Sequence, residues 1–246
     1  MALTRCSTKV DGIALAAALE SPGHAAVGSE TGVSGIRITD DRECLAAADV
    51  YIDFTFHLAV PVNMEDATHH RAGVVLGTTG LSKDETAAVH KTAEKIPIVW
   101  APNMSLGVNV LFELVRQAAA SLGLDYDAEI VETHHRHKKD APSGTALGIA
   151  EHLAGGRNQT LGDVACYGRE GETGGRPRGQ IGIHAIRSGD IVGDHTVTFS
   201  DDGEQVIIGH RATSRDTFAL GALKAARWVK GKAPGIYTMR DVLGLT

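Results

Sequence analysis

Short apolar runs alternate with longer segments of helical periodicity through the first half of the chain. The apolar runs predict strands at 13–19, 50–54, 73–76 and 96–100, and the segments between them predict helices at 57–72 and 82–95. Ser82 followed by Glu85 is the capping-box pattern of a helix start. Strands that alternate with helices are typical of a parallel sheet covered by helices. The first half therefore predicts an α/β domain.

The second half has a different pattern. It predicts a helix at 106–122, a strand at 128–133, a helix at 143–153, a Gly-rich loop at 155–179, strands at 180–187, 190–200 and 204–212, and a helix at 217–229. Tight turns at Ser188-Gly189 and Asp201-Asp202-Gly203 would join the last three strands, which predicts a mostly antiparallel sheet. We therefore expect an α+β domain at 106–215 and an α/β domain formed by 1–105 and 216–246.

Composition limits the possible functions. With 246 residues, 43% of them hydrophobic, the chain is long enough for two domains with their own cores. A net charge of −6 argues against nucleic-acid binding, which needs a basic surface. No apolar run reaches membrane-spanning length, and no signal peptide is recognisable. Three dispersed cysteines, Cys6, Cys44 and Cys166, indicate reduced thiols that serve in packing. We expect a cytoplasmic protein without a nucleic-acid or membrane partner.

Three imidazoles and three permanent cations lie within 134–139, just before a predicted helix start. Ser143 is the expected N-cap, which places the backbone N–H groups of Gly144 and Thr145 in the first turn. Unpaired amides and the helix dipole favour an anion at such a start. The run and the helix start together predict a site for a small substrate that carries carboxylates.

The same run carries groups that exchange protons. His134, His135, His137 and Lys138 could each supply a proton to a bound substrate. Two other interpretations stay open, a solvated loop of cations and a zinc site. No Cys, Asp or Glu stands at a convincing ligand spacing, and adjacent imidazoles in an extended chain point to opposite sides. We predict no metal.

Small and polar residues follow three of the predicted strands. Phe54-Thr55, Gly77-Thr78-Thr79-Gly80 and Ala101-Pro102-Asn103 stand at strand ends. In open parallel sheets, ligands bind beyond the carboxyl ends of the strands, where Gly and Thr let backbone approach a flat ring or a ribose. An ordinary turn is the alternative for 77–80. Three such ends in consecutive units predict a binding crevice.

Glu20 ends the first predicted strand. In dinucleotide-binding domains an acidic residue at such a strand end binds the adenine ribose, about 20 residues after a glycine-rich phosphate loop. Counting back from Glu20 reaches the first residues of the chain, which contain no Gly-x-Gly-x-x-Gly. We therefore expect the chain to open inside the first helix, with the preceding strand and phosphate loop absent. The alternative for Glu20 is an exposed turn residue.

Motifs along nearly the whole chain resemble one family. They are Ile52-Asp-Phe-Thr55, Gly77-Thr-Thr-Gly80, Ala101-Pro-Asn-Met-Ser-Leu-Gly-Val-Asn109, Glu132-Thr-His-His-Arg-His-Lys-Lys-Asp-Ala-Pro-Ser-Gly-Thr-Ala146, Tyr167-Gly-Arg-Glu-Gly171, Arg187-Ser-Gly-Asp-Ile-Val-Gly-Asp-His-Thr196, His210-Arg-Ala-Thr-Ser-Arg215 and Met239-Arg-Asp-Val-Leu243. The chain resembles 4-hydroxy-tetrahydrodipicolinate reductase, also called dihydrodipicolinate reductase, of the diaminopimelate route to lysine. The 132–146 motif is the most specific of them.

The resemblance implies a Rossmann-like cofactor domain, a substrate domain that also builds a homotetramer, and NAD(P)H-dependent reduction of a small dicarboxylate to tetrahydrodipicolinate. It implies that His134 is the proton donor/acceptor, that Lys138 is a second proton donor, and that His135 with Gly144 and Thr145 holds the substrate carboxylates. The cofactor residues that it implies are Glu20, Gly77, Thr78, Thr79, Ala101, Pro102, Asn103 and Met104.

Two departures from the family pattern concern the cofactor. The glycine-rich loop has no counterpart, and Ser21 stands where many members carry Arg for the 2′-phosphate, so NADH is at least as well favoured as NADPH. Two other hypotheses remain: a non-catalytic truncated homologue that binds dicarboxylates or assembles, and a related reductase of a small imino acid.

Overall fold

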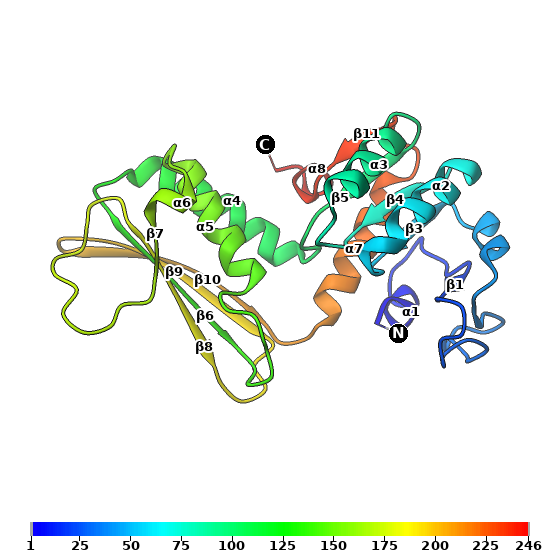
Figure 1. Ribbon diagram of the computed structural model, residues 1–246, viewed down its shortest axis with the longest axis horizontal. Coiled ribbons are helices and arrows are strands. Elements are labelled where there is room, and N and C mark those ends of the chain that lie inside the picture. The colour runs from blue at the N-terminus through cyan, green and yellow to red at the C-terminus, as the bar shows by residue number, and fades with distance from the viewer. Residues whose placement is uncertain (1, 246) are drawn as a thin grey trace. The chain divides into compact units, whose positions relative to one another are not determined.

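The computed structural model describes residues 2–245, which form two compact units (Figure 1). One unit contains the chain up to Leu106 and again from Asp216 onward, and the other is Gly107–Arg215. Among the described residues, no helix is both long and apolar enough to pass through a bilayer.

The first unit is built on a four-stranded parallel sheet. Its strands, in the order β11-β5-β4-β3, are Gly235–Tyr237, Pro97–Trp100, Gly73–Leu76 and Val50–Asp53. Helices α2 (Val60–His70) and α3 (Lys83–Ala93) pack with Val74 and Leu76 on one face. Helices α7 (Asp216–Val229) and α8 (Met239–Leu243) pack with Val75 on the other. A parallel sheet buried on both faces confirms the α/β prediction.

Local signals in this unit predicted several elements closely. The strand at 73–76 has the predicted bounds, and Ser82 and Glu85 form both hydrogen bonds of the capping box. The predicted helix at 57–72 begins with a 3-10 turn, η2 (His57–Ala59), before α2.

The predicted strand at 13–19 is wrong over most of its length. Only β1 (Ala18–Leu19) pairs as a strand, and its parallel partner β2 (Ile38–Thr39) is only two residues long. A strand needs a neighbour to pair its backbone N–H and C=O groups, so the apolar run cannot extend beyond that partner as a strand. The remaining elements of this region are α1 (Ala2–Ser7), whose Cys6 is fully buried in a small core, and η1 (Arg42–Ala47).

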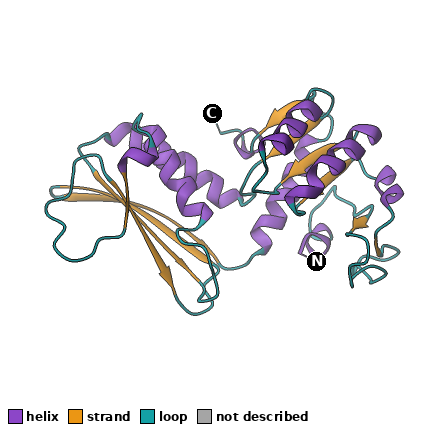
Figure 2. Cartoon of the chain, in the orientation of Figure 1, coloured by secondary structure: helices purple, strands orange, loops and turns teal. Residues whose placement is uncertain are grey.

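The second unit has a five-stranded mixed sheet. Its strands, in the order β10-β9-β6-β8-β7, are Glu204–Ala212, Gly193–Asp201, Asp127–His134, Ile181–Arg187 and Ala165–Tyr167. Helices α4 (Leu106–Leu122) and α5 (Gly144–Gly156) pack on one face of this sheet and bury its apolar residues (Figure 2). The antiparallel hairpin between β9 and β10 closes at the predicted Asp202-Gly203 turn.

Two details of the second unit differ from prediction. Strands β8 and β9 do not pair through the Ser188-Gly189 turn, because β6 lies between them, parallel to β8 and antiparallel to β9. Helix α5 supplies the crossover that a parallel pair requires, so the sheet is mixed rather than mostly antiparallel. The predicted loop at 155–179 contains the end of α5, the short helix α6 (Leu161–Val164) and strand β7.

Candidate functional site

The predicted N-cap of the second unit is present. Ser143 has extended backbone dihedrals, and its hydroxyl accepts a hydrogen bond from the N–H of Ala146 at 3.1 Å. Gly144 follows as an exposed residue, and a Cβ there would meet no atom within 4 Å. Thr145 is half-buried beside it. The first turn of α5 is therefore open enough for an anion to approach its amides.

His134 is the last residue of β6 and is buried at the start of the cationic run. Its Nδ1 lies 2.5 Å from a carboxylate oxygen of Glu132, and the other oxygen of that carboxylate accepts from the backbone N–H of Ser143 at 2.9 Å. His195, on β9, presents its ring edge to His134 at a centroid distance of 5.2 Å. The imidazole predicted to exchange protons is thus fixed next to the start of α5.

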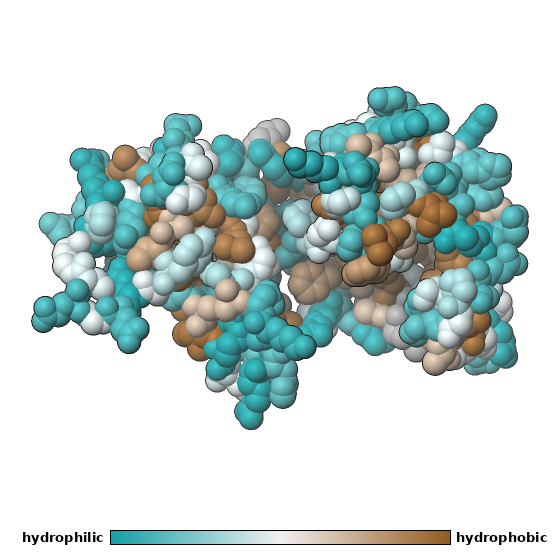
Figure 3. All heavy atoms as spheres, viewed as in Figure 1, coloured by the Kyte–Doolittle hydropathy of each residue, from teal (hydrophilic) through white to brown (hydrophobic). Residues whose placement is uncertain are grey.

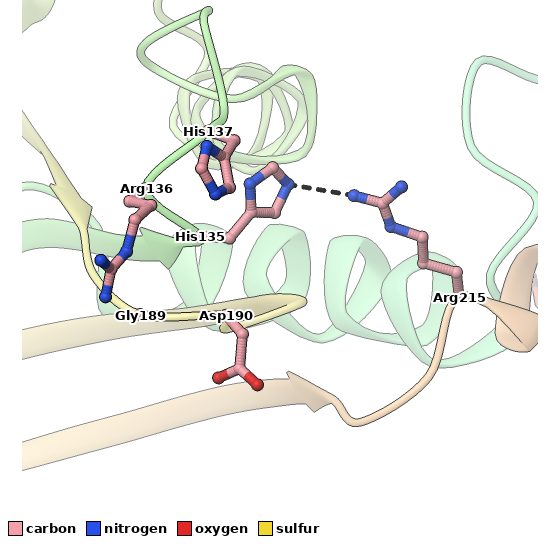
Figure 4. A pocket seen from close by; sticks show the side chains of 6 residues that line it. All are labelled: His135, Arg136, His137, Gly189, Asp190 and Arg215. Carbon is pink, nitrogen blue, oxygen red and sulfur yellow. Dashed lines mark hydrogen bonds between the residues drawn. The ribbon is translucent and has the colours of Figure 1, made fainter.

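His135 lines an open pocket of about 680 Å³ together with Arg136, His137, Gly189, Asp190 and Arg215 (Figure 4). Arg215 donates a hydrogen bond to His135 Nε2 at 3.0 Å. Burial and the nearby Arg215 guanidinium lower the pKa of His135, so the ring is neutral and carries its proton on Nδ1. A pocket of this size with several cationic donors suits a small anion.

Lys138 does not line that pocket. Its ammonium donates to both carboxylate oxygens of Asp140 at 2.8 Å. This ion pair lowers the pKa of Asp140. The predicted second proton donor is therefore held by a neighbouring carboxylate two residues away. Within residues 2–245, no three His, Cys, Asp or Glu side chains are grouped so as to hold a metal ion.

The residues predicted to line a cofactor follow β4 and β5 in the first unit, and several are buried. The Thr78 hydroxyl donates a hydrogen bond to Asp53 Oδ1 at 2.9 Å, which connects the end of β4 to the end of β3. Ala101 and Met104 are also buried. A ligand at this edge would meet these three residues through their backbone, whereas Thr79 and Pro102 are exposed and Gly77 and Asn103 are half-buried.

Phe54 forms a flat apolar surface at the same sheet edge. It is 45% exposed, and a Cβ placed on Gly77 would lie 2.2 Å from its ring, so the ring rests directly on the Gly77 backbone. Hydrophobic atoms reach the surface of both units (Figure 3), but here an aromatic ring meets bare backbone at a carboxyl strand end. This arrangement requires glycine at position 77.

Glu20 directly follows β1 and is half-buried. One carboxylate oxygen accepts from the backbone N–H of Ser21 at 2.8 Å and lies 3.1 Å from its hydroxyl. The backbone hydrogen bond lowers the pKa of Glu20, so the carboxylate is ionised at neutral pH and acts as an acceptor. An ionised acceptor suits ribose hydroxyls.

Comparison with known families decides the identity of the chain. Residues 1–104 match the family described as dihydrodipicolinate reductase, N-terminus, and residues 107–243 match dihydrodipicolinate reductase, C-terminus. The chain belongs to the dihydrodipicolinate reductase family. This membership confirms the resemblance that the motifs carried.

Individual relatives agree with the family. A 4-hydroxy-tetrahydrodipicolinate reductase from Anaeromyxobacter dehalogenans is 48% identical, covering 99% of this chain and 93% of that protein. One from Thiobacillus denitrificans is 49% identical over 96% of this chain and 90% of that protein. The solved structure of a dipicolinate-bound dihydrodipicolinate reductase from Paenisporosarcina sp. TG-14 superposes with a TM-score of 0.78 at 24% identity, over 96% of this chain and 92% of that one, and shows the same fold.

The sequence motifs contain four polar residues to which sequence reasoning assigns no role. Glu132 is two positions from His134 on a strand, and this spacing places both on one face. Arg187, His195 and Arg215 belong to other motifs, and no local signal indicates that they contact residues 52 or more positions away in the chain.

Proposed function

We propose that this chain catalyses the NAD(P)H-dependent reduction of 4-hydroxy-tetrahydrodipicolinate to tetrahydrodipicolinate in the diaminopimelate pathway of lysine biosynthesis. The observation that carries the proposal is the buried imidazole of His134, linked through Glu132 to the open amide start of α5. Proton-exchanging and anion-binding groups meet there within one motif of the family. Such a biosynthetic reaction fits the cytoplasm, which we propose as its location.

The substrate residues follow from this geometry. The amides of Gly144 and Thr145 would bind one carboxylate at the helix start. His135, whose neutral ring donates through Nδ1, would bind another oxygen of the substrate. His134 would exchange the proton that accompanies reduction, and Lys138 would be a second donor once the substrate carboxylates compete with Asp140 for its ammonium. General acid catalysis of this kind typically contributes about 10²–10⁴ in rate.

The first unit fits a nicotinamide cofactor. The exposed Phe54 ring over the Gly77 backbone provides a flat surface for a ring or ribose, and the ionised Glu20 provides an acceptor for ribose hydroxyls. Thr79, Pro102 and Asn103, with the backbone of Thr78, Ala101 and Met104, complete the proposed lining. When bound, the nicotinamide supplies the hydride, and the chain orients it.

We propose NADH as the preferred form of the cofactor. The Glu20 carboxylate is held ionised by the Ser21 amide, and a 2′-phosphate next to it would meet like charge. Changing Ser21 to Arg adds a cation beside this carboxylate and should raise the ratio of kcat/KM for NADPH over NADH by about tenfold, equivalent to about 1.4 kcal/mol. Steady-state kinetics with both cofactors measures the ratio. A wild-type preference for NADPH would contradict the assignment.

We also propose that the second unit assembles the chain into a homotetramer. Helices α4 and α5 cover one face of its sheet, whereas the opposite face carries three exposed apolar side chains on different strands, Val131, Ile186 and Ile207. Apolar side chains that share one sheet face are a suitable surface for self-association. Light scattering after gel filtration measures the mass, and a monomer at micromolar concentration would contradict the proposal.

Replacement of Lys138 by Ala tests the proposed function. We expect kcat for reduction of 4-hydroxy-tetrahydrodipicolinate to fall by about 100-fold, within the range for loss of a general acid. NADH absorbance follows turnover. Lys139→Ala, which removes the exposed neighbouring ammonium, is the matched control and should stay near wild type. Wild-type turnover in the Lys138 variant would reject the role of Lys138, and a wild-type chain that binds NADH without reducing this substrate would reject the function.

A further inference from the structure

Glu132 is a fully buried carboxylate in β6 with four hydrogen-bond donors around it. Arg187 on β8 donates one hydrogen bond to each oxygen, both at 2.9 Å. The backbone N–H of Ser143 donates to Oε1 at 2.9 Å, and His134 Nδ1 lies 2.5 Å from Oε2. A carboxylate offers about four acceptor positions, and all are in use here.

Arg187 supplies a permanent positive charge that pairs with Glu132. A bidentate arginine neutralises the carboxylate, and this guanidinium is itself fixed by a hydrogen bond to the Asp140 carbonyl at 2.6 Å. The contact with His134 is therefore not needed to neutralise the charge. Its effect falls on the imidazole.

The protonation state of Glu132 determines the tautomer of His134. Burial by itself would raise the pKa of Glu132, but the hydrogen bonds from Arg187, His134 and the Ser143 amide outweigh burial and leave the pKa below its usual value. An ionised carboxylate only accepts hydrogen bonds. His134 Nδ1 must therefore carry a proton, and Nε2 is the ring nitrogen that is left to gain and lose one.

The second ring nitrogen of His134, Nε2, is not engaged in a hydrogen bond with any of the described residues. The strand that faces it has glycine at the point of closest approach, and a Cβ on Gly193 would lie only 3.0 Å from Nε2. On the same strand, His195 is 3% exposed, and burial lowers its pKa to about 4, so a neutral ring packs against His134 at neutral pH.

We infer that Glu132, anchored by Arg187, is the positioning residue for His134, and that it fixes Nδ1–H so that Nε2 is the proton-exchanging atom. The inference rests on the proposed function. In the overall reaction the substrate's C–OH bond breaks and the hydroxyl leaves as water. Hydride from the nicotinamide forms one C–H bond on the resulting conjugated ring, and the Nε2–H bond of the imidazolium breaks as its proton forms a second C–H bond. The electron pair of the broken bond stays on Nε2, and the Nδ1–H group keeps its hydrogen bond to Glu132. A water molecule then reprotonates Nε2. Glu132 remains ionised throughout.

Replacing Glu132 with Gln removes the charge and keeps the shape. We expect kcat to fall by about 100-fold with KM changed less than threefold, because the orientation and protonation of His134 are lost rather than substrate contacts. The pH–kcat/KM profile should also differ from that of the wild type, because the group that faces Nδ1 is no longer a charged carboxylate. Other charged or titratable groups near this ring are His195, at a centroid distance of 5.2 Å, the adjacent His135, and Arg187, which reaches it through Glu132.

Two further variants separate positioning from general structural loss. Glu132→Asp keeps the charge and should restore the wild-type pH profile, even where kcat stays low because the carboxylate is shorter by one methylene. Glu113→Gln is the matched control: Glu113 is a buried carboxylate in α4 that pairs with Arg116 at 2.6 Å. It should lower the melting temperature without moving the pH profile.

A readout without turnover distinguishes this inference from the proposed function. The ¹⁵N shifts of the His134 ring in the full chain should show Nδ1 protonated in the neutral wild-type ring, and a tautomer mixture in Glu132→Gln. If the wild type shows this tautomer and no reductase activity, the function fails while the positioning stands. An active wild type with Nε2 protonated, or a Glu132→Gln variant with wild-type kcat and pH profile, would overturn the inference.

Discussion

Replacing Gly193 with Ala tests whether His134 Nε2 is the atom that reacts. An added Cβ would lie 3.0 Å from Nε2 and 3.4 Å from Cδ2 of that ring. Contacts between such atoms are optimal near about 3.5–4.0 Å, so the imidazole must move by roughly half an ångström. Because a misplacement of about 1 Å can cost about 100-fold, we expect kcat to fall by about tenfold. A methyl group over Nε2 would also hinder the substrate.

The same change should have a modest effect on stability. Gly193 does not have positive φ, so its backbone accepts alanine. Overpacking costs about 1–3 kcal/mol, and removal of a strand glycine returns about 0.5–1 kcal/mol, so the net loss is at most about 2.5 kcal/mol. That corresponds to a fall in melting temperature below about 10 °C for a chain of this size. Circular dichroism would follow the melting.

Gly209→Ala is the control for this experiment. Gly209 lies on the neighbouring strand β10, and an added Cβ would meet the His195 carbonyl at 3.6 Å, an ordinary contact. Its kcat should equal that of the wild type. A folded Gly193→Ala enzyme with wild-type kcat would refute the assignment of Nε2 as the reacting atom.

Two further predictions concern the second histidine and the cofactor edge. Burial lowers the pKa of His195 from 6.5 to about 4 in the folded chain. As the pH falls, the unfolded chain therefore takes up a proton at His195 before the folded chain does. The free energy of unfolding is unaffected by His195 above about pH 6.5 and decreases as the pH falls towards 4. The decrease in the free energy of unfolding is on the order of 3 kcal/mol. In His195→Gln, the free energy of unfolding measured with urea should vary less with pH between 6.5 and 4. The same pH dependence in this variant as in the wild type would contradict burial of His195 as the cause. Gly77→Ala should displace the exposed Phe54 ring and raise KM for NADH several-fold at nearly constant melting temperature, with Gly155→Ala, whose added Cβ meets nothing within 4 Å, as control; an unchanged KM would argue against a cofactor at this edge.

The elements that sequence predicted well depend on local signals. The capping box of Ser82 and Glu85 and the N-cap at Ser143 involve residues three apart, so their side chains meet as soon as the helix forms. The helix at 106–122 and the strand at 204–212 have the bounds that periodicity predicted. The pairing of β8 with β6 could not be predicted in this way, because the turn chemistry at Ser188-Gly189 favoured a neighbouring antiparallel strand.

In the candidate site, too, the contacts between residues close in sequence could be predicted and those between distant strands could not. The sequence indicates that His134 and Ser143 belong to one motif, and the period of two places Glu132 on the same face of the strand as His134. It does not indicate that Arg187 lies opposite His134 in the sheet register, 53 positions later. The partner of the buried carboxylate is therefore set by strand pairing, and that pairing depends on the crossover through α5.

This dependence explains why the cationic run is not simply a solvated loop. The first residue of the run, His134, is hydrogen-bonded to Glu132. The four donors to Glu132 come from β6, β8 and the start of α5. Removing any donor leaves a buried carboxylate oxygen short of one hydrogen bond, which costs about 1–3 kcal/mol, so the sheet, the helix start and the imidazole form together. The later residues of the run, Arg136 and His137, are exposed and line the pocket. One motif thus contains a buried end, where we propose that protons are exchanged, and a solvent-facing cationic end, which suits the proposed protonation of a small dicarboxylate.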